Sequence, residues 1–134
     1  MKKDIIPPVV SDIAVAIVHE EGEDGTMIWN SYLLNLKDET IEGVLVSTKG
    51  YGNKNKESVK TSMLRHFLDT MGPRSFSKIE PIVEDLLGLS NEFWVSFYLN
   101  KVMHDKKYVF MAESIAEKNL IKIPLIDKKG VMIK

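Results

Sequence analysis

Hydrophobic and polar residues alternate along most of the chain with the period of two that is typical of β-strands. The clearest case is 92–99, where Phe93, Val95, Phe97 and Leu99 share one parity. Because successive side chains of a strand point to opposite faces of its sheet, this pattern predicts a strand with one apolar face.

A hairpin is predicted directly after this strand. Asn100-Lys101 has the composition of a two-residue turn, and 102–111 returns with strand-forming residues. In that register Tyr108 and Phe110 join the apolar face of the preceding strand, where cross-strand pairs stabilise a sheet.

Further strands are predicted where hydrophobic residues alternate or cluster, over 12–20, 27–36, 41–48 and 76–83. The first of these has hydrophobic residues at both parities, which favours a strand covered on both faces. Gly43 indicates a bulge or a close backbone approach, and Pro81 confines the last strand to an edge.

The segment 59–71 fits two interpretations. Hydrophobic residues recur at every fourth position, and Ser58 is placed to cap a helix. As a strand, the same segment puts Met63, Arg65 and Phe67 on one face. We favour the strand because the surrounding segments are all predicted to be β.

The remaining segments are predicted to be connections, short helical turns and an apolar tail. Residues 50–58, with two glycines and two asparagines, are interpreted as a mobile connection between strands. Single helical turns are expected within 81–88 and 114–120. The apolar tail 119–134, with a turn at Lys129-Gly130, is expected to dock on its own domain or on a second copy.

Together these elements predict one domain, 1–134, with a mainly β fold and flexible residues at 1–8. About seven short strands with polar turns and one or two helical turns are typical of a two-sheet β-sandwich of the immunoglobulin-like type.

Composition and charge limit the cellular compartments and the classes of binding partner that fit this chain. The chain has 134 residues, with 18 basic and 19 acidic side chains and a formal charge of −1, so it lacks the basic excess of a dedicated nucleic-acid binder. Zero cysteines exclude a disulfide scaffold and a cysteine nucleophile. Asp4 and Pro7-Pro8 interrupt any early apolar run, and we expect a cytoplasmic protein with no membrane partner.

Few residues in the sequence have the types and spacings that catalysis or metal binding requires. His19, His66 and His104 are widely spaced and form no metal-ligand motif. Residues 20–24 gather carboxylates that suit a Ca²⁺ or Mg²⁺ ion, but their spacing fits no known loop, and a solvated turn is favoured. We predict no catalytic residue, no metal and no cofactor.

Two groups of residues form the candidate binding surface. Lys54 and Lys56, with Tyr51, lie in a segment that resembles a phosphate loop but lacks its Gly-Lys-Ser/Thr ending. If strands alternate in direction, this segment lies at the same end of the sandwich as the acidic turn, and the two would form a polar interaction surface.

Trp94 and Tyr98 have the parity opposite to the apolar face of 92–99. If exposed, they would form an aromatic platform for a partner, a sugar ring or a base. We expect instead that another segment covers them, with the tail 119–134 as the candidate, and we interpret Trp29 in the same way.

Three runs of sequence resemble those of a known family: 43–52, 91–99, and the closing 123–133 with Ile123-Pro124-Leu125. The family consists of small bacterial proteins often labelled "phenylalanyl-tRNA synthetase subunit alpha". A synthetase core needs motif arginines, whereas this chain has only Arg65 and Arg74 and neither lies in such a motif. The resemblance therefore implies no catalytic residue.

The function predicted from these features is a non-enzymatic protein–protein interaction module that binds a protein partner or forms a homo-oligomer. The alternative is an RNA- or tRNA-associated accessory protein, as the family label suggests, although the charge balance disfavours nucleic acid. A small hydrolase-type enzyme is the least favoured.

Overall fold

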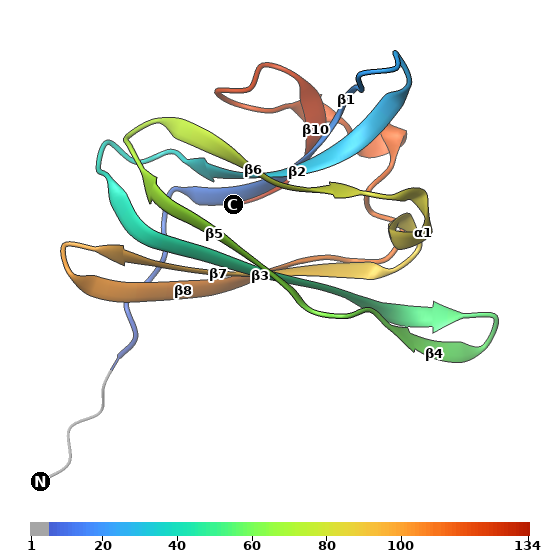
Figure 1. Ribbon diagram of the computed structural model, residues 1–134, viewed down its shortest axis with the longest axis horizontal. Coiled ribbons are helices and arrows are strands. Elements are labelled where there is room, and N and C mark those ends of the chain that lie inside the picture. Colours follow the sequence, from blue (N-terminus) through green and yellow to red (C-terminus); the bar gives the residue numbers. More distant parts are fainter. Residues whose placement is uncertain (1–5) are drawn as a thin grey trace, which may run out of the picture.

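The structure is a computed structural model that describes residues 6–134 and is mainly β, with two antiparallel sheets facing each other (Figure 1). Sheet A has the order β6-β2-β1-β10-β9, with bounds β1 (Ile13–Glu21), β2 (Met27–Asn35), β6 (Ser75–Ile82), β9 (Ile121–Lys122) and β10 (Lys129–Ile133). Sheet B has the order β4-β3-β7-β8, and β5 also pairs with β3; the bounds are β3 (Ile41–Lys54), β4 (Glu57–Lys60), β5 (Leu64–Met71), β7 (Ser90–Leu99) and β8 (Val102–Phe110). The prediction of a mainly β protein with two sheets is confirmed.

Two short helices interrupt the strands: α1 (Glu84–Leu87) and the 3-10 turn η1 (Glu117–Asn119). Both lie within the segments where helical turns were expected. No helix within 6–134 is long and apolar enough to cross a membrane. The flexibility expected for 1–8 falls largely outside the residues that the structure describes.

The core lies between the two sheets and contains alternate residues of the facing strands. Ile13, Val15 and Ile17 of β1 are at most 1% exposed and pack with Phe93 of β7 and many other apolar side chains. Tyr108 of β8 is buried among them and its hydroxyl donates a hydrogen bond to the carbonyl oxygen of Ile13 at 2.6 Å. Burying each large aliphatic side chain contributes about 1.5–3 kcal/mol, so this face dominates the stability of the fold.

The predicted β7–β8 hairpin is present in the expected register. Phe93 pairs with Tyr108, and both are buried. Asn100 and Lys101 have φ angles of 50° and 63°, as a tight two-residue hairpin turn of type I′ requires at both central positions.

The strand interpretation of 59–71 is confirmed for residues 64–71, and the helical alternative is wrong; residues 59–60 end β4, and 61–63 connect the two strands. β5 spans Leu64–Met71 and is antiparallel to β3, with Phe67 opposite Leu45 and Arg65 opposite Ser47. Backbone pairing with a neighbouring strand outweighs the weak helical spacing of the side chains.

Residues 50–58, expected to be a mobile connection, instead form most of a β-hairpin, and this is a correction. β3 continues to Lys54, and β4 returns after a turn in which Asn55 and Lys56 have φ angles of 52° and 67°. Glycine and asparagine suit such a turn as well as they suit a loop. With β4 of this hairpin, the short β9 and β10, the strand count is ten, rather than about seven.

The turn expected at Lys129-Gly130 is also corrected, because both residues belong to β10. Gly130 lies opposite Val18 of β1, and a Cβ atom added to it would meet the carbonyl oxygen of Ile17 at 2.4 Å. The absence of a side chain is therefore what lets β10 approach β1. The turn itself lies between β9 and β10.

That turn, residues 123–128, covers the outer face of sheet A, and we call it the cover segment (Figure 1). Ile123 packs against Ala14, Ala16 and Leu34, and all four residues are 0% exposed. The cover segment thus explains why the first strand is hydrophobic at both parities.

Candidate functional site

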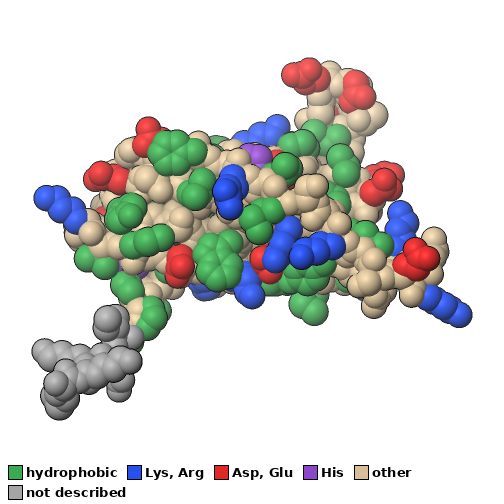
Figure 2. Space-filling view, turned by 60° about the horizontal axis from the view of Figure 1, so that its bottom comes forward, with side chains coloured by type: hydrophobic (Ala, Val, Ile, Leu, Met, Phe, Trp, Pro, Cys, Tyr) green, Lys and Arg blue, Asp and Glu red, His purple; other side chains and the backbone are tan. Residues whose placement is uncertain are grey.

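The outer face of sheet B, on the side away from the core, carries exposed hydrophobic side chains from neighbouring strands. Trp94 and Tyr98 of β7 are 44% and 47% exposed, and Phe67 of β5 is 66% exposed. Met63, before β5, and Met103 of β8 are each 51% exposed. We call this set of five residues the aromatic face. Figure 2 shows hydrophobic side chains interspersed with basic and acidic ones across the underside of the molecule.

A β-bulge in β3 positions Tyr98. The register between β3 and β7 shifts after Glu42, and Gly43 has a φ of 56°. An added Cβ at Gly43 would lie 3.2 Å from the Tyr98 ring, so the ring lies directly against the glycine backbone. A bulge that redirects a side chain is common beside functional surfaces, and the bulge predicted at Gly43 is present.

Trp94 lies in a shallow depression of about 340 Å³ lined by Met63, Glu92 and Lys107 among other residues. The Lys107 ammonium lies 5.8 Å from the centre of the Trp94 ring, within reach of a cation–π contact. Glu92 beside it is only 8% exposed and pairs with Lys49, whose Nζ lies 3.6 Å from Glu92 Oε2.

Charges are graded along this face. Arg65, Ser47, Trp94 and Lys107 form one cross-strand row, so the Trp94 end carries basic side chains. At the other end Glu42 lies opposite Tyr98. Asp105 lies opposite Ser96, midway between the two aromatic rings. Apart from Glu92, which pairs with Lys49, the charged side chains are therefore basic towards Trp94 and acidic towards Tyr98.

The expected cover over Trp94 and Tyr98 is wrong. β10 pairs with β1, β9 pairs with β10, and Ile123 between them packs on sheet A, so this part of the chain is not available to cover sheet B. The expectation that Trp29 is covered is confirmed, because Trp29 is only 9% exposed. Its ring stacks on the ring of His19 with centroids 4.2 Å apart.

The other predicted surface residues fall into two places. Tyr51 lies on the same side of sheet B as Trp94, and its hydroxyl contacts Glu92 Oε1 at 3.3 Å. Partial burial, together with the Glu92 charge and hydrogen bond, raises the pKa of Tyr51. Lys54 and Lys56 lie exposed at the tip of the β3–β4 hairpin and do not join the aromatic face.

Phe67, Met63 and Met103 were not singled out as site residues. The strand interpretation of 59–71 places Met63 and Phe67 on one face, but sequence alone does not say which strand lies beside them. The pairing of Phe67 with Leu45, and of Met103 with Tyr98, brings them to the aromatic face.

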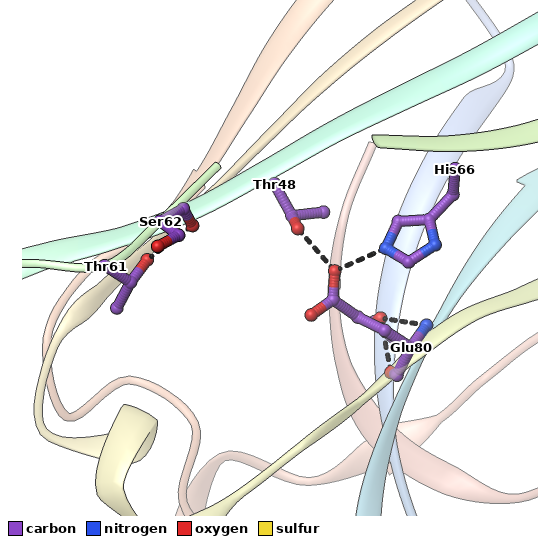
Figure 3. A network of polar contacts seen from close by, with 6 residues as sticks. Thr48, Thr61, Ser62, His66 and Glu80 are labelled. Carbon is purple, nitrogen blue, oxygen red and sulfur yellow. Dashed lines mark hydrogen bonds and ion pairs between the residues drawn. The ribbon is translucent and has the colours of Figure 1, made fainter. Parts of the chain in front are cut away.

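A cluster of polar side chains from β3, β5 and β6 joins the two sheets (Figure 3). Glu80 Oε1 accepts a hydrogen bond from the Thr48 hydroxyl and lies 2.9 Å from His66 Nε2. The β2–β6 register shifts beside Ser31, whose hydroxyl donates to the Glu80 carbonyl oxygen at 2.7 Å. This bulge directs the Glu80 side chain towards sheet B.

The geometry of this cluster does not form a nucleophile-activating relay. A relay needs the histidine between the hydroxyl and the carboxylate, so that the imidazole takes the hydroxyl proton. Here the Thr48 hydroxyl and the His66 imidazole both bond to the same oxygen of Glu80. The contacts tie β3 and β5 to β6.

The acidic residues at 20–24 do not converge on one point. Glu20 is 8% exposed and its carboxylate binds Asn30, Tyr32 and Lys128, with Lys128 Nζ at 2.7 Å. Burial opposes ionisation of Glu20, but these hydrogen bonds outweigh it and lower its pKa. The carboxylate of Asp24 instead accepts hydrogen bonds within its own turn. Within 6–134 no group of three or more His, Asp or Glu side chains is arranged to hold a metal ion.

Comparisons of the chain with protein-family models, with curated proteins and with solved structures give no match. The resemblance to the small bacterial family stays a prediction. The aromatic face and the inter-sheet cluster are therefore the features of the structure from which binding is inferred below.

Proposed function

We propose that this chain is a non-enzymatic protein–protein interaction module and that the aromatic face of sheet B is its contact surface. The half-exposed rings of Trp94 and Tyr98 are the observation that carries the proposal. Tryptophan and tyrosine are enriched at the centres of protein interfaces because they bury much area at a small cost in side-chain entropy. Methionines beside them adapt their shape to a partner.

The graded charge of the face favours a second copy of this chain as the partner. In a two-fold interface the same surface is used twice, so a residue i of one copy meets residue j of the other and the reverse. With the axis running across the strands near Ser96, Arg65 of one copy approaches Glu42 of the other. Opposite charges then face each other on both sides of the axis, which stabilises and orients the pair.

The same charge pattern makes RNA the weaker alternative. Nucleic-acid surfaces present a continuous basic patch, whereas here Glu42, Glu92 and Asp105 alternate with the basic side chains. A filter-binding assay with tRNA at low salt is expected to retain no complex. Retention that falls steeply with salt would favour the RNA alternative.

Two broader inferences complete the proposal. The order β6-β2-β1 in one sheet and β5-β3-β7-β8 in the other supports an immunoglobulin-like type, with β6-β2-β1 as strands E-B-A and β5-β3-β7-β8 as C′-C-F-G. β9 and β10 are then additions beside the first strand. The lack of cysteine supports a reducing compartment, and we propose a cytoplasmic protein.

The first test is the oligomeric state, measured by size-exclusion chromatography with light scattering over a range of concentrations. We expect a dimer whose dissociation constant rises roughly tenfold or more when Trp94 and Tyr98 are both changed to Ala. The matched control is Phe76→Ala, because Phe76 is a 45% exposed aromatic residue on sheet A. A wild-type protein that stays monomeric at high concentration would overturn the second copy as partner.

Complementary charge variants give the sharper test. One variant carries Arg65→Glu, and the other carries Glu42→Lys. Each variant alone is expected to be monomeric because like charges then meet across the axis, whereas a mixture of the two is expected to form a heterodimer. Dimers of either variant alone, or no association in the mixture, would contradict the two-fold arrangement with its axis near Ser96.

A further inference from the structure

A cleft of about 210 Å³ opens between the two sheets beside α1, separate from the aromatic face. Apolar side chains from several elements form much of its wall: Leu64, Ile82, Leu86 and Phe93. Thr61 and Ser62, where the chain passes from β4 to β5, line the side drawn at the left of Figure 3. The cleft is small, so it suits a small molecule or a single side chain.

Glu80 places a carboxylate in this cleft. Its side chain is 14% exposed, and Thr48 and His66 hold one oxygen, Oε1. No side chain or backbone group among residues 6–134 donates a hydrogen bond to the second oxygen, Oε2. Figure 3 shows Oε2 turned away from His66, towards the side where Thr61 and Ser62 lie.

Asn91 supplies a second acceptor in the cleft wall. The residue is 4% exposed, and its Nδ2 donates to the carbonyl oxygens of Leu86 and Leu89 at 2.9 and 3.1 Å. These two bonds fix the orientation of the amide and leave Oδ1 as an acceptor. Lys49 and Glu92 also line the cleft but pair with each other, with Lys49 Nζ 3.6 Å from Glu92 Oε2. The cleft therefore offers the Glu80 and Asn91 acceptors and the Glu80 charge within mostly apolar walls.

We propose that this cleft binds a primary ammonium group on a short aliphatic chain. The ammonium donates to Glu80 Oε2 and to Asn91 Oδ1, and the aliphatic chain lies against Leu86 and Ile82. A charge-assisted hydrogen bond to a carboxylate is about twice as strong as a neutral one, and apolar walls strengthen it further by excluding water. An anionic or purely apolar ligand would donate no hydrogen bond to Glu80 Oε2.

Two sources carry this chemistry: a free alkylamine and a lysine side chain of another protein. The cleft adjoins the depression beside Trp94, since Thr48, Lys49 and Glu92 line both. The proposal does not depend on the aromatic face, because none of the five residues of that face lines the cleft. Failure of the dimerisation tests therefore leaves this site untouched, and failure of amine binding leaves the interaction module untouched.

The test is a titration of the full chain with n-butylammonium chloride, followed by nuclear magnetic resonance of the backbone amides. We expect saturable shifts at Thr48, Thr61, Glu80 and Asn91, and no such shifts with butan-1-ol, which has the same length without the charge. Glu80→Gln is expected to weaken binding about tenfold or more, since it removes the charge but keeps the shape.

Glu20→Gln is the matched control, because Glu20 is also a nearly buried carboxylate but lies on sheet A with its own lysine partner. It is expected to leave amine binding unchanged. Equal shifts with butan-1-ol, or undiminished binding by a folded Glu80→Gln variant, would overturn the site.

A parallel titration with N-acetyl-lysine-methylamide identifies the source. Binding at least as tight as that of butylammonium supports a lysine side chain as the natural ligand. Binding of butylammonium alone supports a free amine, because the cleft then excludes the peptide backbone.

Discussion

Sheet A and sheet B both carry hydrophobic side chains on the side away from the core, and those at the centre of sheet A are covered whereas those of sheet B are not. Ala14, Ala16 and Leu34 are completely buried under the cover segment, where Ile123 packs against them. Trp94 and Tyr98 on the corresponding side of sheet B keep nearly half of their surface exposed. The comparison indicates that one outer face serves stability and the other is available for binding.

The largest effect is expected from Ile123→Ala, which removes the fully buried side chain of the cover segment. Because Ile123 is 0% exposed, we expect a loss of about 2–5 kcal/mol in the free energy of unfolding. Urea denaturation followed by circular dichroism measures it. Ile121→Ala is the control, since Ile121 is 49% exposed and its loss is expected to cost little. An equally small cost at both positions would break the distinction between the two outer faces.

A smaller and pH-dependent effect is expected from Glu20→Gln, because Glu20 ties the cover segment to sheet A through Lys128. Removing a charged, hydrogen-bonded group should cost about 1.5–3 kcal/mol at pH 7. The pKa of Glu20 is lowered in the folded protein, so its stabilisation is present above the unfolded value of about 4.3 and is lost as the pH falls further.

Urea midpoints of the wild type and Glu20→Gln at pH 7 and at pH 3 measure this dependence. The difference between the two proteins is expected to shrink at pH 3. A difference that stays constant would show that the Glu20 charge does not contribute. Burial and the neighbouring Glu20 carboxylate raise the pKa of Tyr32 to about 12, so the tyrosine stays protonated across this range.

On sheet B, Gly43→Ala is expected to cost about 1–2 kcal/mol, because an L-residue in the left-handed region is strained. The new methyl group would also displace the Tyr98 ring, which lies 3.2 Å from its position. Gly72→Ala is the control, since its added Cβ would meet nothing within 4 Å. We expect Gly43→Ala to weaken dimerisation as well; an unchanged dissociation constant would separate Tyr98 from the interface.

The smallest stability change is expected for Trp94→Ala measured under monomeric conditions. An exposed side chain on the outer face contributes little to folding, so the change should stay below about 1 kcal/mol. Association should nevertheless fall sharply. A destabilisation as large as that of Ile123→Ala would mean that the two outer faces have the same role.

The alternation of hydrophobic residues was enough to predict the β class, the β7–β8 hairpin and the register that pairs Phe93 with Tyr108. Strand parity and hairpin turns are local properties, and a sequence carries them within a few residues. The same local reasoning placed Trp94 and Tyr98 together on one face, and the two-sided β1 under a cover.

What could not be predicted depends on contacts between distant segments. The cover segment lies on sheet A and not over Trp94 because β10 pairs with β1, and nothing in residues 119–134 specifies that choice of sheet. The meeting of Thr48, His66 and Glu80 likewise needs the crossing from β5 in one sheet to β6 in the other. Residues 50–58 have a composition that suits either a loop or a tight hairpin. Only the pairing of β4 with the end of β3 distinguishes the two.

The pairing of Val15 with Ile133 has a consequence for biosynthesis. β1 and β2 leave the ribosome early, yet β10 and the cover segment are made after every other strand of sheet A. Until then the nascent chain presents bare alanine, valine and leucine side chains of the first hairpin to solvent. Folding that waits for such a distant partner is slow, and the interval gives a ribosome-associated chaperone a surface to hold.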